Sequence, residues 1–105
     1  MSELKGMQRK YLRGLAHGLK PVVMIGQHGL TDAVIRSTEE ALLAHELIKV
    51  KFNACKEKEQ KAGILSELTA ATGAQAVGQI GHTAVLYRQH PDMEKRHIRL
   101  PAAGA

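Results

Sequence analysis

The chain is short and basic, and its composition excludes several classes of protein. Its 105 residues carry 15 lysine and arginine side chains against 10 acidic ones, a formal net charge of +5. This length suits one domain with a modest core, and the charge favours a polyanionic partner. No apolar run approaches the roughly 18 residues of a membrane span, and the first residues lack the apolar stretch of a secretory signal. The single cysteine, Cys55, excludes an internal disulfide, so we expect a cytoplasmic protein with no membrane partner.

Residues 3–17 are predicted to form a helix with two chemically different faces. Apolar side chains recur at helical spacing and are expected to face the core: Leu4, Met7, Tyr11, Leu12 and Leu15. Basic side chains occupy another face, where Lys5, Arg9 and Arg13 recur every four residues with Lys10 beside them. Such a stripe is usually a solvated helix face. Because only Glu3 is available in the helix to neutralise it, the stripe is also a candidate for binding a polyanion.

A G-x-x-G turn, Gly26-Gln27-His28-Gly29, follows residues 22–25, whose continuous apolar character predicts a short buried strand. Thr31 suits the N-cap of the helix expected after the turn. The two glycines let a foreign backbone approach closely, and the N–H groups at the helix start attract phosphate. Ligands of α/β sheets also gather beyond the carboxyl ends of strands. The turn could equally be purely structural, since glycine is common in such connections.

The remaining residues complete a small α/β domain. Residues 47–52 alternate and predict a strand that has Phe52 on its core side and Lys49 and Lys51 on a cationic side. Residues 56–72 predict a helix, and residues 75–80 and 83–88 predict a hairpin around Gly81-His82. The order α-β-α-β-α-β-β predicts a compact two-layer α/β domain, with helices packed on a small mixed sheet. We expect this domain to span residues 1–101 and a mobile tail to follow at 102–105.

Enzymatic and metal-binding functions find little support in the sequence. The chain has six histidines, but His45-Glu46 does not continue into an H-E-x-x-H zinc signature, and no two histidines lie three or four residues apart. Cys55 is expected to be a passive thiol. We therefore expect no catalytic activity, no metal, no cofactor and no small-molecule substrate. Aromatic residues are few and Tyr11 is assigned to the core, so recognition of a nucleic acid should depend on backbone and shape.

Four ordered stretches together resemble a known family, the CRM domain (chloroplast RNA splicing and ribosome maturation), and in particular its stand-alone bacterial YhbY-like members. The stretches are YLRGLAH (residues 11–17) with KPVV (20–23), GQHGLT (26–31), HELIKVK (45–51) and GHTAVLYR (81–88). The resemblance covers nearly the whole chain. It implies a fold similar to the C-terminal domain of translation initiation factor 3. It also implies a non-catalytic RNA-binding protein that associates with ribosomal RNA in precursors of the large ribosomal subunit.

The resemblance also implies which residues contact RNA. The G-x-x-G loop and the basic surface beside it are the implied site, with Gln27 standing where many members have a lysine. Much of the fixed charge is therefore expected from outside the loop. Arg88 has an alternative role, because it could pair with an acidic residue. The alternative function is a protein-docking module on the ribosome. The candidate RNA-binding residues are Arg9, Lys10, Arg13, Lys20, Gly26, Gln27, His28, Gly29, Leu30, Thr31, Lys49, Lys51 and Arg88.

Overall fold

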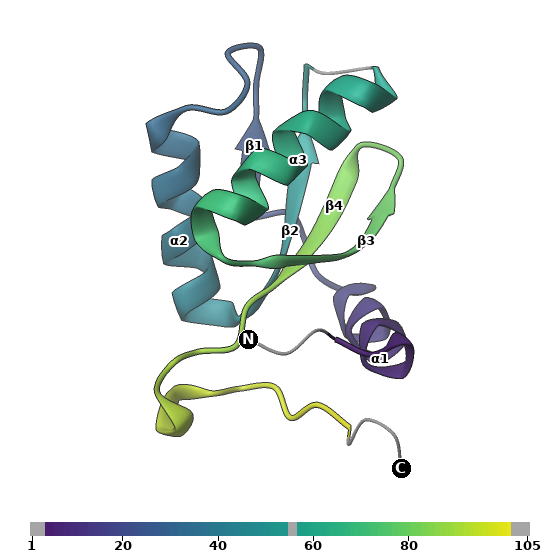
Figure 1. Cartoon of the computed structure of the whole chain (residues 1–105), viewed down its shortest axis with the longest axis vertical. Coiled ribbons are helices and arrows are strands. Elements are labelled where there is room, and N and C mark those ends of the chain that lie inside the picture. The colour runs from purple at the N-terminus through teal and green to yellow at the C-terminus, as the bar shows by residue number, and fades with distance from the viewer. Residues whose placement is uncertain (1–3, 55–56, 102–105) are drawn as a thin grey trace.

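Helices and strands follow one another in the predicted order (Figure 1). A computed structural model describes residues 4–54 and 57–101, so Cys55 and the tail predicted at 102–105 lie outside the described residues. The elements are α1 (Gly6–Ala16), β1 (Val23–Ile25), α2 (Asp32–His45), β2 (Leu47–Phe52), α3 (Lys58–Thr72), β3 (Gln75–Ile80), β4 (Thr83–Tyr87) and a 3-10 turn, η1 (Met93–Lys95). The predicted α/β class and the mixed sheet are both confirmed.

The four strands form one sheet in the order β1-β2-β4-β3. β1 runs parallel to β2, with Ile25 opposite Phe52, whereas β4 runs antiparallel to β2 and β3. The carboxyl ends of β1 and β2 therefore lie at the same end of the sheet as the β3–β4 turn. Figure 1 shows the β1–α2 turn at this end of the molecule, while α1 lies near the other end.

Both faces of the sheet are covered, but by different helices, so α1 adds a third layer to the two that the sequence predicted. α2 and α3 pack on the face that includes Ile25, Val50 and Leu86, each of which is fully buried. α1 covers part of the opposite face, where Leu12 packs in a second cluster with Tyr87. Burying one leucine of this kind contributes about 1.5–3 kcal/mol. Phe52 is 2% exposed, which confirms its predicted place in the core.

The face that α1 turns to the sheet differs from the predicted one. Leu12 and Ala16 are buried, but Met7, Tyr11 and Leu15 are 48%, 42% and 42% exposed, so the prediction of Tyr11 as a core residue is wrong. The physical reason is that α1 also docks through its arginines.

These arginines lie against β3, where the strand has an irregular register between Ala76 and Gly78. Arg9 donates to the Ala76 carbonyl oxygen at 2.8 Å, and Arg13 donates to that of Val77 at 3.0 Å. Two hydrogen bonds of this kind fix the rotation of α1, which periodicity alone does not reveal. The predicted solvent-facing role of the arginine stripe is therefore only partly correct.

The segment after β4 is fastened to the core by Glu46. This residue follows α2 with a φ of +64°, and its side chain is fully buried. Its carboxylate accepts hydrogen bonds from the backbone N–H groups of His90, His97 and Ile98. Burial alone would raise the pKa of the Glu46 carboxyl, but these three N–H groups, together with the nearby charge of His97, outweigh it and hold the pKa below the usual value. Ile98 can therefore pack against the α1 side of the sheet.

Candidate nucleic-acid interface

The β1–α2 connection is a closed turn with an exposed outer surface. Gly29 has a φ of +66°, and its N–H donates to the Gly26 carbonyl oxygen at 3.0 Å. Gly29 is thus the position where the turn requires glycine. Gly26, Gln27 and His28 are all exposed, and a Cβ on Gly26 would meet no atom within 4 Å. The backbone of this loop is open to an approaching ligand.

The start of α2 adds hydrogen-bond donors beside the turn. The Thr31 hydroxyl accepts from the Val34 N–H at 3.2 Å, which confirms Thr31 as the N-cap. Helix geometry leaves other N–H groups of the first turn without an intrahelical partner, and these favour anions. Leu30 and Thr31 are half-buried, but Asp32 is exposed in the first turn and adds a negative charge there. Phosphate binding at this end therefore requires cations from neighbouring elements.

Lys51 is the predicted cation that the sheet places at the same end as the turn. Met24, Lys51, Thr83 and Ile80 are register partners in one row across all four strands. Their side chains lie on the α1 side of the sheet, beyond the area that α1 covers. Lys51 is exposed, and Met24 and Ile80 are 50% and 80% exposed. Lys49 lies on the same face and is half-buried, with its Nζ 3.4 Å from the His17 carbonyl oxygen.

The cations of α1 are not gathered around the turn. Figure 1 shows α1 and the β1–α2 turn at different ends of the molecule. Lys20 precedes β1, so it lies at the end of this strand that is opposite the turn. Arg9 and Arg13 are held by β3 as described above. Each guanidinium has five N–H donors, so the one bond to a carbonyl leaves others for a phosphate. Lys10 is exposed.

Arg88 has a structural position in the described fold. Its Nη1 donates to the Glu39 carboxylate at 2.7 Å and to the Thr72 carbonyl oxygen at 2.7 Å. The side chain is 15% exposed. The alternative expected from the sequence, pairing with an acidic residue, is therefore confirmed. This pair joins α2, the end of α3 and the end of β4.

Two lysines near the end of the sheet that carries the β1–α2 and β3–β4 turns were not predicted as site residues from the sequence. Lys61 is 7% exposed, and its Nζ donates to the Gly81 carbonyl oxygen at 3.1 Å and lies 3.2 Å from His82 Nδ1. It fastens the β3–β4 turn to α3. Lys58 is exposed in the first turn of α3, close in sequence to the end of β2. The sequence signal for them is the excess of lysine in residues 47–62, but periodicity alone cannot show that Lys61 lies against the β3–β4 turn.

The described residues limit other kinds of site. Within residues 4–54 and 57–101, no group of three or more histidine, cysteine, aspartate or glutamate residues could hold a metal ion. In the same ranges, none of the helices is both long and apolar enough to span a bilayer.

The fold and the turn define a class of small α/β domains that carry a G-x-x-G loop after the first strand of a four-stranded mixed sheet. The family model described as the CRS1 / YhbY (CRM) domain matches residues 4–88. The chain therefore belongs to the CRS1 / YhbY (CRM) domain family, and the resemblance found in the sequence is confirmed.

Two relatives and one solved structure match over almost their whole length. An RNA-binding protein of Haemophilus influenzae is 46% identical over 101 residues, which cover 96% of this chain and 98% of that protein. A second relative, "Probable RNA-binding protein YqeI" of Bacillus subtilis, is 38% identical over 93% of this chain and 99% of its own. The solution structure of hypothetical protein SAV1595 from Staphylococcus aureus, described as a candidate RNA-binding protein, superposes with a TM-score of 0.78. Its sequence is 32% identical, and the superposition covers 94% of this chain and 100% of the SAV1595 chain.

Proposed function

We propose that this protein is a non-catalytic RNA-binding protein of large-subunit assembly. It binds ribosomal RNA in precursor particles through the G-x-x-G loop and adjacent cations. The observation that carries the proposal is the loop itself, since Gly29 closes the turn while the exposed Gly26 backbone stays open to a ligand. Family membership supports it, and the relatives in Haemophilus influenzae and Bacillus subtilis bear RNA-binding names.

The loop acts as a neutral cradle and draws its charge from its surroundings. Gln27 and His28 offer side-chain donors to phosphate or to a 2′-hydroxyl. Lys51, on the sheet beside the turn, supplies the nearest of the predicted fixed charges, and Lys49 extends it along β2. Arg9, Lys10, Arg13 and Lys20 then serve an RNA long enough to reach the α1 end of the domain. This arrangement favours recognition of a structured RNA backbone over reading of base sequence.

Gly26→Leu tests the loop without straining the fold. The new Cβ meets no atom within 4 Å and the φ of Gly26 is not positive, so the side chain projects into the space that RNA would occupy. We expect affinity for fragments of large-subunit ribosomal RNA to fall by about tenfold or more, equivalent to about 1.4 kcal/mol. Fluorescence anisotropy measures the affinity, and thermal unfolding checks the fold.

Gly18→Leu is the matched control, because Gly18 is also exposed with no atom within 4 Å of an added Cβ. Equal RNA affinity in the two variants would contradict the assignment of the loop. Crosslinking in cells, with sequencing of the attached RNA, tests the ribosomal target. Recovery of RNAs other than large-subunit precursors would overturn the assembly role while leaving RNA binding intact.

A further inference from the structure

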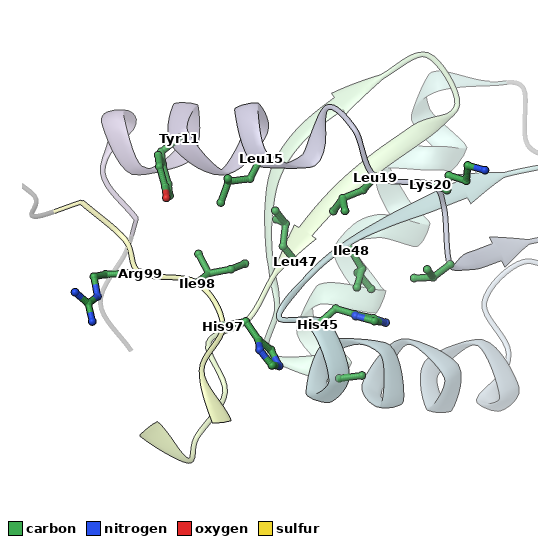
Figure 2. Close-up of a pocket in the computed structure, with 12 residues that line it drawn as sticks. Tyr11, Leu15, Leu19, Lys20, His45, Leu47, Ile48, His97, Ile98 and Arg99 are labelled. Atoms are coloured by element: carbon green, nitrogen blue, oxygen red, sulfur yellow. The ribbon is translucent and has the colours of Figure 1, made fainter. Parts of the chain in front are cut away.

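An apolar groove lies on the side of the domain that carries α1. It has a cavity volume of about 640 Å³, and Figure 2 shows α1 along one side and the end of α2 with residues 97–99 along the other. Aliphatic side chains form most of its lining: Leu15, Leu19, Val22, Leu47, Ile48 and Ile98. Tyr11 is the aromatic side chain among the lining residues, and Figure 2 shows it and Leu15 extending from α1 toward Ile98.

The groove explains why α1 has apolar side chains that do not face the sheet. Tyr11 and Leu15 are four residues apart, and Leu19 continues the row beyond the helix. The three side chains are 42%, 42% and 40% exposed, and Val22 beside them is 51% exposed. Contiguous exposed apolar surface of this kind, bordered by polar groups, is typical of an interaction site.

The charge around the groove has one sign. Lys20 and Arg99 lie at its two ends, and His45 and His97 lie along the side opposite α1 (Figure 2). None of the side chains that line it, all of them within the described ranges, is acidic. The carboxylate of Glu46 is close in sequence to His45, but three backbone N–H groups already occupy it. An occupant with acidic residues flanking an apolar face would match both properties.

We propose that this groove docks an acidic amphipathic helix of a partner protein. Such a helix presents apolar anchors at positions i, i+3, i+4 and i+7 to a groove and leaves its charged residues at the rim. This interaction goes beyond RNA binding, and its surface lies away from the G-x-x-G loop and shares only Lys20 with the candidate RNA-binding residues.

Other occupants fit less well. A second copy joined face to face by a two-fold axis would place two basic rims together, because the same residues meet in such an interface. RNA offers few apolar groups for an aliphatic lining, and one tyrosine gives little surface for base stacking.

A designed pair of peptides tests the proposal. Each has about 15 residues and the same leucine pattern, but one carries glutamate and the other lysine at the remaining charged positions. We expect the glutamate peptide to bind the full chain at least about tenfold more tightly at low salt. In NMR titrations its amide shifts should centre on Leu15, Leu19 and Ile98.

Matched leucine variants identify the surface. Leu15→Gln and Leu19→Gln should each weaken binding of the glutamate peptide by about tenfold or more, the effect of removing a central anchor. Leu43→Gln is the control, because Leu43 is 44% exposed on α2 but does not line the groove. All three variants should bind RNA as the parent does, whereas Gly26→Leu should lose RNA and keep the peptide.

Several results would overturn the proposal independently of RNA binding. These are equal affinity for the two peptides, no binding of either, or equal loss in the Leu43 control. Self-association abolished by Leu19→Gln would assign the groove to a second copy. RNA-induced shifts centred on Leu15 and Leu19 would assign it to RNA.

Discussion

Glu46 is the residue on which the position of the C-terminal segment depends. It occupies a backbone conformation that non-glycine residues adopt rarely, with a φ of +64°. Its carboxylate binds three N–H groups from residues 90–98, which continue into one side of the apolar groove. A glycine would suit the backbone better, but it could not fasten the segment. The side chain therefore compensates for an unfavourable local conformation.

Glu46→Gln should destabilise the fold and make the free energy of unfolding less dependent on pH in the acid range. Glutamine keeps one acceptor oxygen, but its NH2 group cannot accept a hydrogen bond from a backbone N–H. We therefore expect the free energy of unfolding to fall by about 1–3 kcal/mol at pH 7. The folded pKa of Glu46 lies below the ordinary value of 4.5. The stabilisation that the ionised Glu46 carboxylate gives to the fold is therefore complete above the pKa of this group in the unfolded chain. It is lost as the pH falls through the pKa of the group in the folded protein.

Denaturant unfolding of both proteins between pH 7 and the acid limit of folding would measure this effect. The free-energy difference between them should shrink below the unfolded pKa of the carboxyl. Glu40→Gln, an exposed change on α2, is the control and should change stability little. A constant difference at all pH values would show that the loss comes from packing and not from the charged carboxylate.

At the scale of elements, local pattern predicted type and order well, but not orientation. Alternation in β2 correctly separated Phe52 from Lys51, because a strand has only two faces. α1 carries two apolar rows, one through Leu12 and one through Tyr11, and periodicity cannot say which row meets the sheet. The bonds from Arg9 and Arg13 to β3 decide it, and they involve residues more than 60 positions apart. Such contacts leave no local signal.

Gly78 and Arg13 should be energetically coupled across the α1–β3 contact. An ideal Cβ on Gly78 would lie 2.8 Å from Cδ of Arg13 and 3.1 Å from its Cγ, so Gly78→Ala must displace the arginine. Arg13 is exposed and can move, so the cost is mainly its hydrogen bond to Val77, and we expect a destabilisation of about 0.5–1.5 kcal/mol. Adding Arg13→Ala removes the clash, so the double variant should be more stable than the sum of the single effects by about 0.5–1.5 kcal/mol. Additive unfolding free energies would show that Arg13 does not lie over Gly78 in solution.

Across the whole molecule, the fold distributes the basic residues over separate surfaces. The sequence could predict the G-x-x-G loop, because its glycines and N-cap are neighbours in the chain. It could not predict that Lys51 shares the end of the sheet with this loop, since that follows from strand register. Nor could it separate Lys51 from Arg88, whose role depends on Glu39 and the Thr72 carbonyl. Which cations can meet one RNA is thus a property of the topology.

The salt dependence of RNA binding should distinguish these two basic residues. If Lys51 neutralises a phosphate, Lys51→Gln should lower the magnitude of the log–log slope of affinity against salt by about 0.7–0.9. Its side chain is exposed, so the stability of the fold should hardly change. Arg88→Gln should leave the slope as it is and lower the free energy of unfolding, because Glu39 loses its 2.7 Å partner. An unchanged slope in Lys51→Gln would remove that lysine from the interface, whereas a reduced slope in a fully folded Arg88→Gln would place Arg88 in it.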